Sequence, residues 1–225
     1  VDVAQLPSFL SEMQRRRFDL VVQMHGNGSV TNPVAFCFGG RTTAGFCPSA
    51  DACPDRGRFL PWPAEEPEIW RQLSLMAHLG FEPQGDELEF AVTAADDAAA
   101  TACLADHGVP PDAPFVCLHP GARAAWRRWS AESFAEVADA LAVRGWRVVI
   151  TGVEDERGLA GRIAGHMRHP AANLAGRVPH LGALAALVAR AGLLVCGDTG
   201  LSHLASAVAT PSAGNPVATP KCAAM

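Results

Sequence analysis

Short apolar runs alternate with segments of helical spacing through the second half of the chain, and this alternation limits the available folds more than any other feature. The apolar runs, which we interpret as strands, are residues 115–118, 146–151, 173–175 and 193–196. The helical segments are residues 131–144, 156–167 and 181–190, with a further helix from residue 201. Strands that alternate with helices predict a parallel sheet with right-handed crossovers and helices on both faces. We therefore expect an α/β fold.

The first half of the chain shows a looser version of the same pattern. Helical spacing over residues 5–17 leads into an apolar run over residues 18–24, which predicts a helix followed by a buried strand. The later predicted elements are a short helix at 32–38, a strand at 43–46, a mostly irregular surface segment at 47–67, a helix at 68–79 and a strand at 87–92. An Ala-rich stretch then changes the composition. We place a domain boundary there, between residues 1–93 and 94–225.

Composition and charge exclude several classes of protein. At 225 residues the chain is long enough for one large or two small domains, and 49% hydrophobic with 18% charged residues describes a globular protein. The formal net charge of -5 provides no broad basic surface, so nucleic acid is not an expected partner. No apolar run reaches membrane-spanning length. The basic cluster at residues 15–17 fits either a solvated helix end or contact with an anionic membrane surface.

The cysteines indicate a reducing compartment. They are scattered without a C-x-x-C motif, and Cys103, Cys117 and Cys196 lie in apolar segments, as reduced core thiols do. Cys47 and Cys53 form the only plausible local pair, and their spacing does not match a zinc site. We expect a cytoplasmic protein with no signal peptide and no bound metal.

Residues 195–207 have the form of a strand, a turn and a helix. A strand that ends in a Gly-bearing turn and opens a helix leaves backbone N–H groups unpaired at the helix start. These donors and the positive end of the helix dipole form a site for phosphate. The residues at this site are Asp198, Thr199, Gly200 and His203. The alternative is that Asp198 caps the helix and His203 is a structural residue of its first turn.

Four loops of the second half follow predicted strands, at residues 119–123, 152–155, 176–180 and 198–200. In a parallel sheet they meet at one edge, where open α/β sheets bind their ligands. Gly121, Arg127 and Arg128 precede a predicted helix and suit a diphosphate, because guanidinium groups offer forked donors to phosphate oxygens. Glu154 lies where a carboxylate could accept hydrogen bonds from ribose hydroxyls. The structural alternative is a pair of exposed arginines and a His119 that bonds to backbone.

The loop after the first predicted strand contains His25 and Asn27 beside Gly26 and Gly28. The two glycines resemble the beginning of a dinucleotide fingerprint, but no third glycine follows in register. A plain glycine-rich turn is therefore favoured, and an NAD-dependent oxidoreductase is disfavoured.

Five segments of the second half together carry a resemblance. They are His119-Pro120-Gly121-Ala122, Arg127-Arg128-Trp129 with Phe134, Thr151-Gly152-x-Glu154, Leu174-Ala175-Gly176-Arg177 and Gly197-Asp198-Thr199-Gly200-Leu201-Ser202-His203-Leu204-Ala205. This ordered set resembles glycosyltransferase family 9, the family of the ADP-heptose:lipopolysaccharide heptosyltransferases. The resemblance spans residues 115–211, and residues 18–46 resemble part of the family's N-terminal domain more loosely.

The resemblance implies a GT-B-like fold with two Rossmann-like domains and parallel sheets. It also implies inverting transfer of a sugar from a nucleotide-diphosphate donor to a lipopolysaccharide or lipid-linked acceptor, without a metal or other cofactor. The implied donor-binding residues are Gly121, Arg127, Glu154, Asp198, Thr199, Gly200 and His203. Arg127 takes the place of the family's usual lysine, and Glu154 faces the ribose. The N-terminal domain receives the acceptor, so His25 and Asn27 lie on the acceptor side.

Two departures from the family pattern qualify this expectation. The family's first strand, its glycine-rich loop and the carboxylate expected to act as the catalytic base lie upstream of Val1, so we expect an incomplete N-terminal domain and assign no base. Residues 213–225 lack a clear period, contain the only lysine of the chain and do not resemble the family. The leading hypothesis is a glycosyltransferase of envelope glycan synthesis at the cytoplasmic face of the inner membrane. The alternative is a non-catalytic remnant that binds a nucleotide-sugar.

Overall fold

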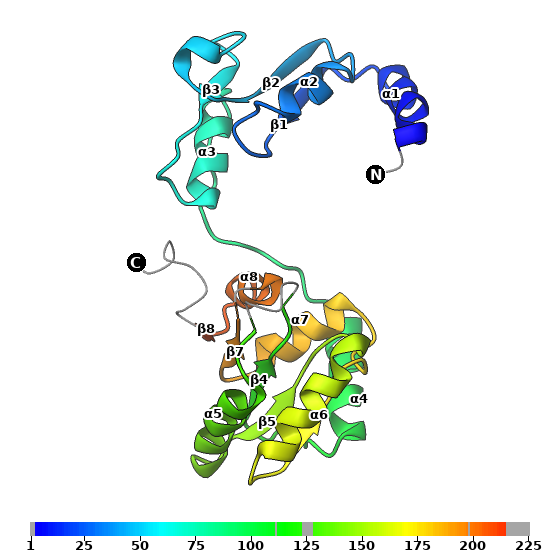
Figure 1. The fold of residues 1–225 in the computed structure, drawn as a ribbon, viewed down its shortest axis with the longest axis vertical. Coiled ribbons are helices and arrows are strands. Elements are labelled where there is room, and N and C mark those ends of the chain that lie inside the picture. The colour runs from blue at the N-terminus through cyan, green and yellow to red at the C-terminus, as the bar shows by residue number, and fades with distance from the viewer. Residues whose placement is uncertain (1–2, 111, 123–127, 198, 215–225) are drawn as a thin grey trace. The chain divides into compact units, whose positions relative to one another are not determined.

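The computed structural model describes residues 3–110, 112–122, 128–197 and 199–214. The chain divides into two compact units, Val1–Asp86 and Glu87–Met225, each built around a parallel sheet (Figure 1). The sequence placed the boundary at residue 93, whereas the contacts divide the chain after Asp86.

The first unit contains a sheet of three parallel strands in the order β1-β2-β3. Its elements are α1 (Leu6–Arg15), β1 (Leu20–Gln23), α2 (Thr31–Phe36), β2 (Thr42–Cys47), β3 (Phe59–Pro61) and α3 (Glu68–His78), with 3-10 turns at Val3–Gln5 and Ala50–Ala52. The strand β3 was not expected, because residues 47–67 were predicted to be mostly irregular. Phe59 explains its formation: its side chain is only 2% exposed, and its backbone pairs with Gly45 of β2.

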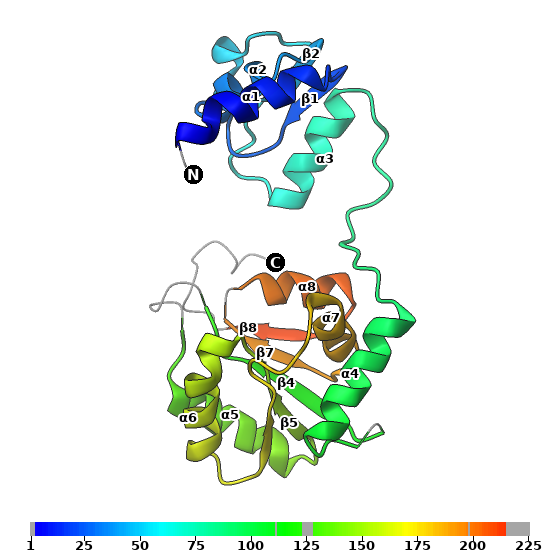
Figure 2. The ribbon, with the colours of Figure 1, turned by 90° about the vertical axis from the view of Figure 1, so that its right-hand side faces the viewer.

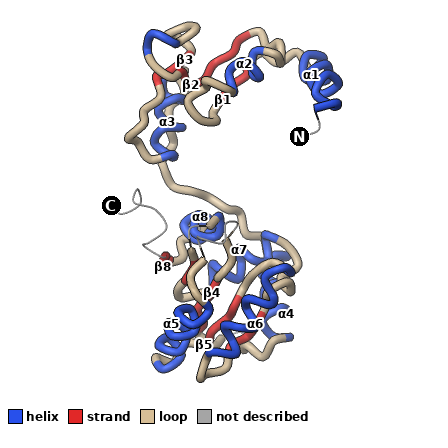
Figure 3. Tube along the Cα trace, viewed as in Figure 1, coloured by secondary structure: helices blue, strands red, loops and turns tan. Residues whose placement is uncertain are grey.

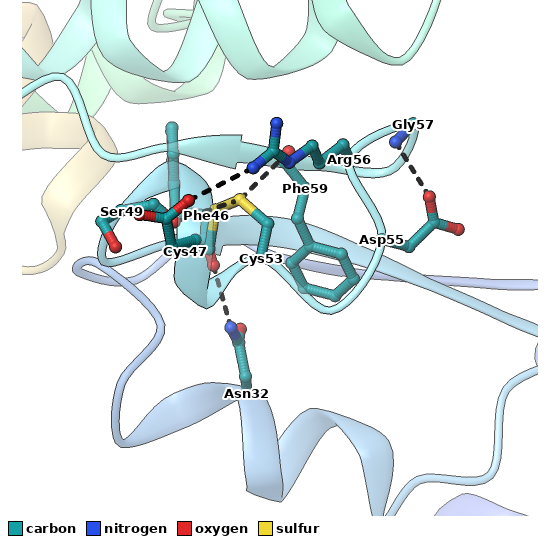
Figure 4. Close-up of a disulfide and its surroundings, with 10 residues drawn as sticks. Asn32, Phe46, Cys47, Ser49, Cys53, Asp55, Arg56, Gly57 and Phe59 are labelled. Carbon is teal, nitrogen blue, oxygen red and sulfur yellow. Dashed lines mark hydrogen bonds and ion pairs between the residues drawn. A yellow bond between two sulfur atoms is a disulfide. The ribbon is translucent and has the colours of Figure 1, made fainter.

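A disulfide joins Cys47 to Cys53 in the loop between β2 and β3 (Figure 4). The cysteine pattern had indicated reduced thiols, and this pair departs from that expectation. Cys103, Cys117 and Cys196 are buried, as predicted for core thiols.

The second unit contains a sheet of five parallel strands in the order β6-β5-β4-β7-β8. Its elements are α4 (Ala94–Asp106), β4 (Phe115–His119), α5 (Ala131–Val143), β5 (Arg147–Ile150), α6 (Arg157–His166), β6 (Ala171–Asn173), α7 (Leu181–Arg190), β7 (Leu194–Cys196), α8 (Gly200–Ala207) and β8 (Ser212–Gly214), with a 3-10 turn at Glu154–Glu156. Figure 3 shows the alternation of strands and helices along the chain. The predicted parallel α/β fold is confirmed.

Alternate residues of each strand face opposite layers, because successive side chains in a strand point to opposite sides of the sheet. Phe115 and Cys117 of β4 join the apolar core beneath α4, α7 and α8. Val116 and Leu118 join a separate core beneath α5 and α6. The sheet is therefore covered on both faces, which explains its continuous apolar strands (Figure 2).

Three predicted elements of the second unit need correction. Residues 87–92 form no strand; they are extended, and Phe90 packs against the core beneath α7. The strand predicted at residues 173–175 lies slightly earlier, at Ala171–Asn173, where it pairs with β5. The tail that did not resemble the family was given as residues 213–225. Its first residues belong to β8 (Ser212–Gly214), which pairs with β7. Residues 215–225 lie outside the described residues.

Within the described residues, none of the helices combines the length and the apolar character needed to cross a membrane. The same residues contain no group of three or more His, Cys, Asp or Glu side chains arranged to hold a metal ion.

Candidate functional site

The order of strands in the second sheet creates a natural binding position. The chain runs outward from β4 to β5 and β6, then returns through α7 to place β7 on the other side of β4. His119 at the end of β4 therefore lies in register with Cys196 at the end of β7. Open α/β sheets bind ligands at such a reversal, outside the carboxyl ends of the strands. All four predicted loops follow these parallel strands, so their placement at one edge is confirmed.

The start of α8 offers unpaired hydrogen-bond donors at this edge. Thr199 precedes the helix in an extended conformation, and its side chain does not cap the helix. Its carbonyl accepts hydrogen bonds from Ser202 N at 3.1 Å and from Ser202 Oγ at 2.7 Å. A Cβ added at Gly200 would meet no atom within 4 Å, so the space over the first turn is open. The helix start therefore keeps backbone N–H groups available for an anion.

The Thr199 hydroxyl is a second feature of this helix start. Its Oγ1 is buried without a hydrogen-bond partner among the described residues. A buried hydroxyl without a partner is unfavourable, so it is a signal for a ligand that completes its hydrogen bonding. Asp198 and Arg127, which the sequence placed beside this hydroxyl, lie outside the described residues.

His119 lies at the end of β4 with a defined proton. Thr151 Oγ1 donates to the Leu118 carbonyl at 3.3 Å, so it accepts from His119 Nδ1 at 3.1 Å. The neutral ring then carries its proton on Nδ1 and leaves Nε2 as an acceptor. Burial lowers the pKa of His119, and the nearby Glu156 carboxylate opposes part of that shift.

A groove of about 530 Å³ joins His119 to the start of α8. Gly200 and His203 of α8 share this groove with His119, so the structure brings the first and fourth predicted loops together. The rest of its lining is mostly apolar and includes Leu88, Phe90, Leu181, Leu184, Leu201 and Leu204.

Glu156 connects the first and second loops, although the sequence pattern did not single it out as a site residue. A Cβ added at Gly121 would collide with Glu156 Oε1, so the carboxylate lies directly against the Gly121 backbone. Glu156 Oε2 also accepts a hydrogen bond from Val153 N at 3.0 Å. The available signal was the pair of glycines, Gly121 and Gly152, because both leave room for this carboxylate.

Glu154, the predicted ribose ligand, lies on the other side of the same turn. Its side chain is 65% exposed, and Oε1 accepts from Arg157 Nη1 at 2.8 Å. A Cβ added at Gly176 would collide with Glu154 Oε2, so this carboxylate lies over the third loop. The two glutamates therefore contact different loops at the carboxyl edge of the sheet: Glu156 lies against the first loop and Glu154 against the third.

Arg128 supports the first loop from outside the groove. It is exposed, and its Nε donates to the Ala122 carbonyl at 2.9 Å. Arg128, Glu156 and Arg162 line a second, more polar pocket of about 320 Å³ beside α6.

His25 and Asn27 lie in the first unit, in the loop between β1 and α2. Asn27 Oδ1 accepts from Ser29 N at 3.1 Å, and the His25 carbonyl accepts from Thr31 Oγ1 at 3.0 Å. Gly26 and Gly28 both have positive φ, as a tight turn requires. These contacts are those of a structured glycine-rich turn at the carboxyl end of β1.

Comparison with known proteins assigns this architecture to a family. The family model described as glycosyltransferase family 9 (heptosyltransferase) matches residues 7–214. Lipopolysaccharide heptosyltransferase 3 of Escherichia coli is 39% identical over 102 residues, which cover 43% of this chain and 29% of that protein. Lipopolysaccharide heptosyltransferase 1 of Pseudomonas aeruginosa is 33% identical over 107 residues, which cover 45% of this chain and 28% of that protein. The match thus spans less than a third of the length of these curated relatives.

Solved structures share the fold. The family 9 glycosyl transferase of Veillonella parvula has a TM-score of 0.76 at 19% identity, covering 94% of this chain and 61% of that one. The Escherichia coli heptosyltransferase WaaC with ADP has a TM-score of 0.67 at 20% identity, covering 95% of this chain and 68% of that one. The fold is therefore GT-B-like. Because the family model matches well over half of its residues, the chain belongs to glycosyltransferase family 9, the heptosyltransferase family.

Proposed function

We propose that this chain is part of an inverting glycosyltransferase that moves a heptose-like sugar from a nucleotide-diphosphate donor to a lipopolysaccharide or related envelope glycan. The observation that carries the proposal is the start of α8, at the strand-order reversal. There the backbone donors are open, and the Thr199 hydroxyl has no partner among the residues that the structure describes. WaaC, which shares the fold, was solved with ADP.

In this proposal the donor's diphosphate lies over Thr199 and Gly200, with Asp198 and His203 beside it. Arg127 supplies the guanidinium that offsets the charge of the departing diphosphate. Gly121 lets the first loop pack closely against the second, because its lack of a side chain leaves room for the Glu156 carboxylate. Glu154 faces the ribose, and Glu156 is a second candidate for that contact.

The chemistry asked of these groups is electrostatic. The acceptor hydroxyl attacks the anomeric carbon and loses its proton, while the bond from that carbon to the diphosphate breaks. Backbone donors, a hydroxyl and a guanidinium around the diphosphate stabilise the charge that develops on it. The proposal needs no metal or other cofactor. We assign the role of the catalytic base to no residue of this chain.

The acceptor and the cellular location follow from the family by analogy. We propose a lipopolysaccharide or lipid-linked acceptor received by the first unit, with His25 and Asn27 on that side. The protein would act in the cytoplasm at the inner face of the inner membrane. The arginines at residues 15–17 are the basic group available for a peripheral contact with anionic lipid.

Calorimetric titration with ADP and UDP tests the donor site. Thr199→Val removes a hydroxyl that has no hydrogen-bond partner among the described residues, so the free energy of unfolding should stay the same or rise. If the hydroxyl binds phosphate, the same change should weaken nucleotide binding by roughly tenfold, the worth of one net hydrogen bond. Arg127→Ala removes a charge-assisted contact and should weaken binding by roughly ten- to a hundredfold.

Cys103→Ser, in α4 away from the α8 start, is the control and should bind as the parent does. Equal affinities for the parent, Thr199→Val and Arg127→Ala would refute the donor site. Nucleotide binding without sugar transfer to any lipopolysaccharide acceptor would favour the second candidate, a non-catalytic nucleotide-sugar-binding protein.

A further inference from the structure

The disulfide between Cys47 and Cys53 lies outside the site described above. Cys47 is the last residue of β2 and is fully buried, whereas Cys53 is half-buried in the loop that follows (Figure 4). Their Cα atoms are 5.1 Å apart, within the range of disulfides. The two sulfur atoms therefore differ in how easily a molecule from solvent reaches them.

Cys47 is held by contacts that do not depend on the disulfide. Its carbonyl accepts from Trp62 N at 2.8 Å, and the preceding carbonyl, of Phe46, accepts from Asn32 Nδ2 at 2.9 Å. The Phe46 and Trp62 rings pack edge to face, with centroids 4.9 Å apart. The carboxyl end of β2 is thus anchored to α2 and to the segment after β3.

The other end of the bond lies in an exposed segment with local contacts. Every residue from 48 to 58 except Cys53 is exposed. Most contacts found here are short-range, such as Ala52 N to the Ser49 carbonyl at 3.1 Å and Arg56 to Asp51 at 3.4 Å. At the end of the segment, the Arg58 carbonyl accepts a hydrogen bond from Gly45 N of β2 at 3.1 Å. Before that hydrogen bond, over residues 48–57, the disulfide is the main tie to the buried end of β2.

We infer that Cys47–Cys53 is a redox-reversible modification site whose state sets the mobility of residues 48–58. The co-reactant is a dithiol reductant. One of its thiolates attacks the accessible Cys53 Sγ, the Cys53–Cys47 bond breaks, and the electron pair leaves on Cys47 Sγ, which takes up a proton. The second thiol, as its thiolate, attacks the reductant's sulfur in the mixed disulfide and releases Cys53. The reductant leaves as a cyclic disulfide, and the protein gains two thiols.

The other described cysteines do not compete for this chemistry. Cys103, Cys117 and Cys196 are buried in the second unit, and burial raises the pKa of the Cys103 and Cys117 thiols. Cys37 is exposed and free, which makes it the matched control for thiol labelling.

The test is a redox titration of the whole chain in mixtures of reduced and oxidised dithiothreitol, read by alkylation, peptide mapping and amide hydrogen exchange. In samples that are acid-quenched and then unfolded before labelling, Cys47 and Cys53 should become alkylatable together. Amides of residues 49–58 should exchange at least roughly tenfold faster after reduction, while β4 is unchanged. Cys37→Ser should titrate as the parent does. Absence of the linked peptide from the oxidised protein, or equal exchange in both states, would overturn the inference.

Two variants test the direction of attack. In Cys47→Ser the remaining Cys53 should form a mixed disulfide with glutathione, whereas in Cys53→Ser the buried Cys47 should resist it. Faster modification of Cys47 in the second variant than of Cys53 in the first would also overturn the inference. If Cys47→Ser fails to fold, glutathione trapping on the parent decides the point, because the mixed disulfide should then be found on Cys53.

Discussion

Two glutamates two positions apart, Glu154 and Glu156, occupy different surroundings at the carboxyl edge of the second sheet. Glu156 lies against Gly121 and raises the pKa of His119, which burial lowers. Glu154 is exposed, paired with Arg157 and directed over Gly176. The difference arises in the 3-10 turn Glu154–Glu156, which directs the two side chains to different loops. Only one of the two carboxylates therefore acts on His119.

Glu156→Gln should lower the pKa of His119 further, because the variant loses the negative charge that favours the protonated ring. An NMR titration that follows the His119 ring proton measures this directly. Glu154→Gln is the matched control and should leave the His119 titration unchanged. A shift in the control but not in Glu156→Gln would show that the wrong carboxylate faces the histidine.

At the scale of elements, the buried Asp139 on α5 ties down the turn between α6 and β6. Its carboxylate accepts from Arg168 N and His169 N, both at 3.0 Å, and from the Arg168 and His169 side chains at 3.2 and 3.0 Å. These donors, with the Arg168 backbone N–H first, hold the pKa of Asp139 well below its usual range. The Asp139 side chain is 5% exposed, so no solvent replaces a lost partner.

The free energy of unfolding should therefore depend on pH through Asp139. A carboxylate with a lowered pKa in the folded state contributes stability above its unfolded pKa of about 4, and that contribution is lost as the pH falls toward the folded value. Urea unfolding at a series of pH values from 7 downward should show Asp139→Asn destabilised at pH 7 and less sensitive to acid than the parent. Asp86→Asn, an exposed carboxylate, should follow the parent; equal acid sensitivity of both variants would contradict this role.

At the scale of the whole molecule, the residues proposed to bind the donor belong to one unit. The second unit has its own apolar cores on both faces of its sheet, and the groove at His119 and Gly200 is lined by its residues alone. A unit with its own core is expected to fold by itself.

Residues 87–225, expressed alone, should unfold in a single cooperative transition and bind ADP as tightly as the whole chain. Circular dichroism during urea unfolding and calorimetric titration are the measurements. Residues 1–86 should bind no ADP and provide the control. Loss of nucleotide binding in a folded second unit would mean that the first unit supplies part of the donor site.

The sequence by itself determined the parallel α/β fold, the separation into two units and the edge on which the four loops gather. These features follow from periodicity, since apolar runs such as 115–118 specify which backbone is buried, and the parallel direction then brings the strand ends to one edge. The cores on the two faces of β4 are a direct consequence of the same pattern.

Only the tertiary structure decided which neighbours meet. Residues 87–92 have a strand-like pattern but pair with no strand, while Phe59–Pro61 pairs because a buried neighbour, β2, lies beside it. The same holds for two contacts. Glu156 rather than Glu154 lies against Gly121, and Cys47 is bonded to Cys53, because the folded chain brings these residues together. The periodicity of apolar residues predicts which face of a strand or helix is buried. Which residues pack against that face is decided by the tertiary structure.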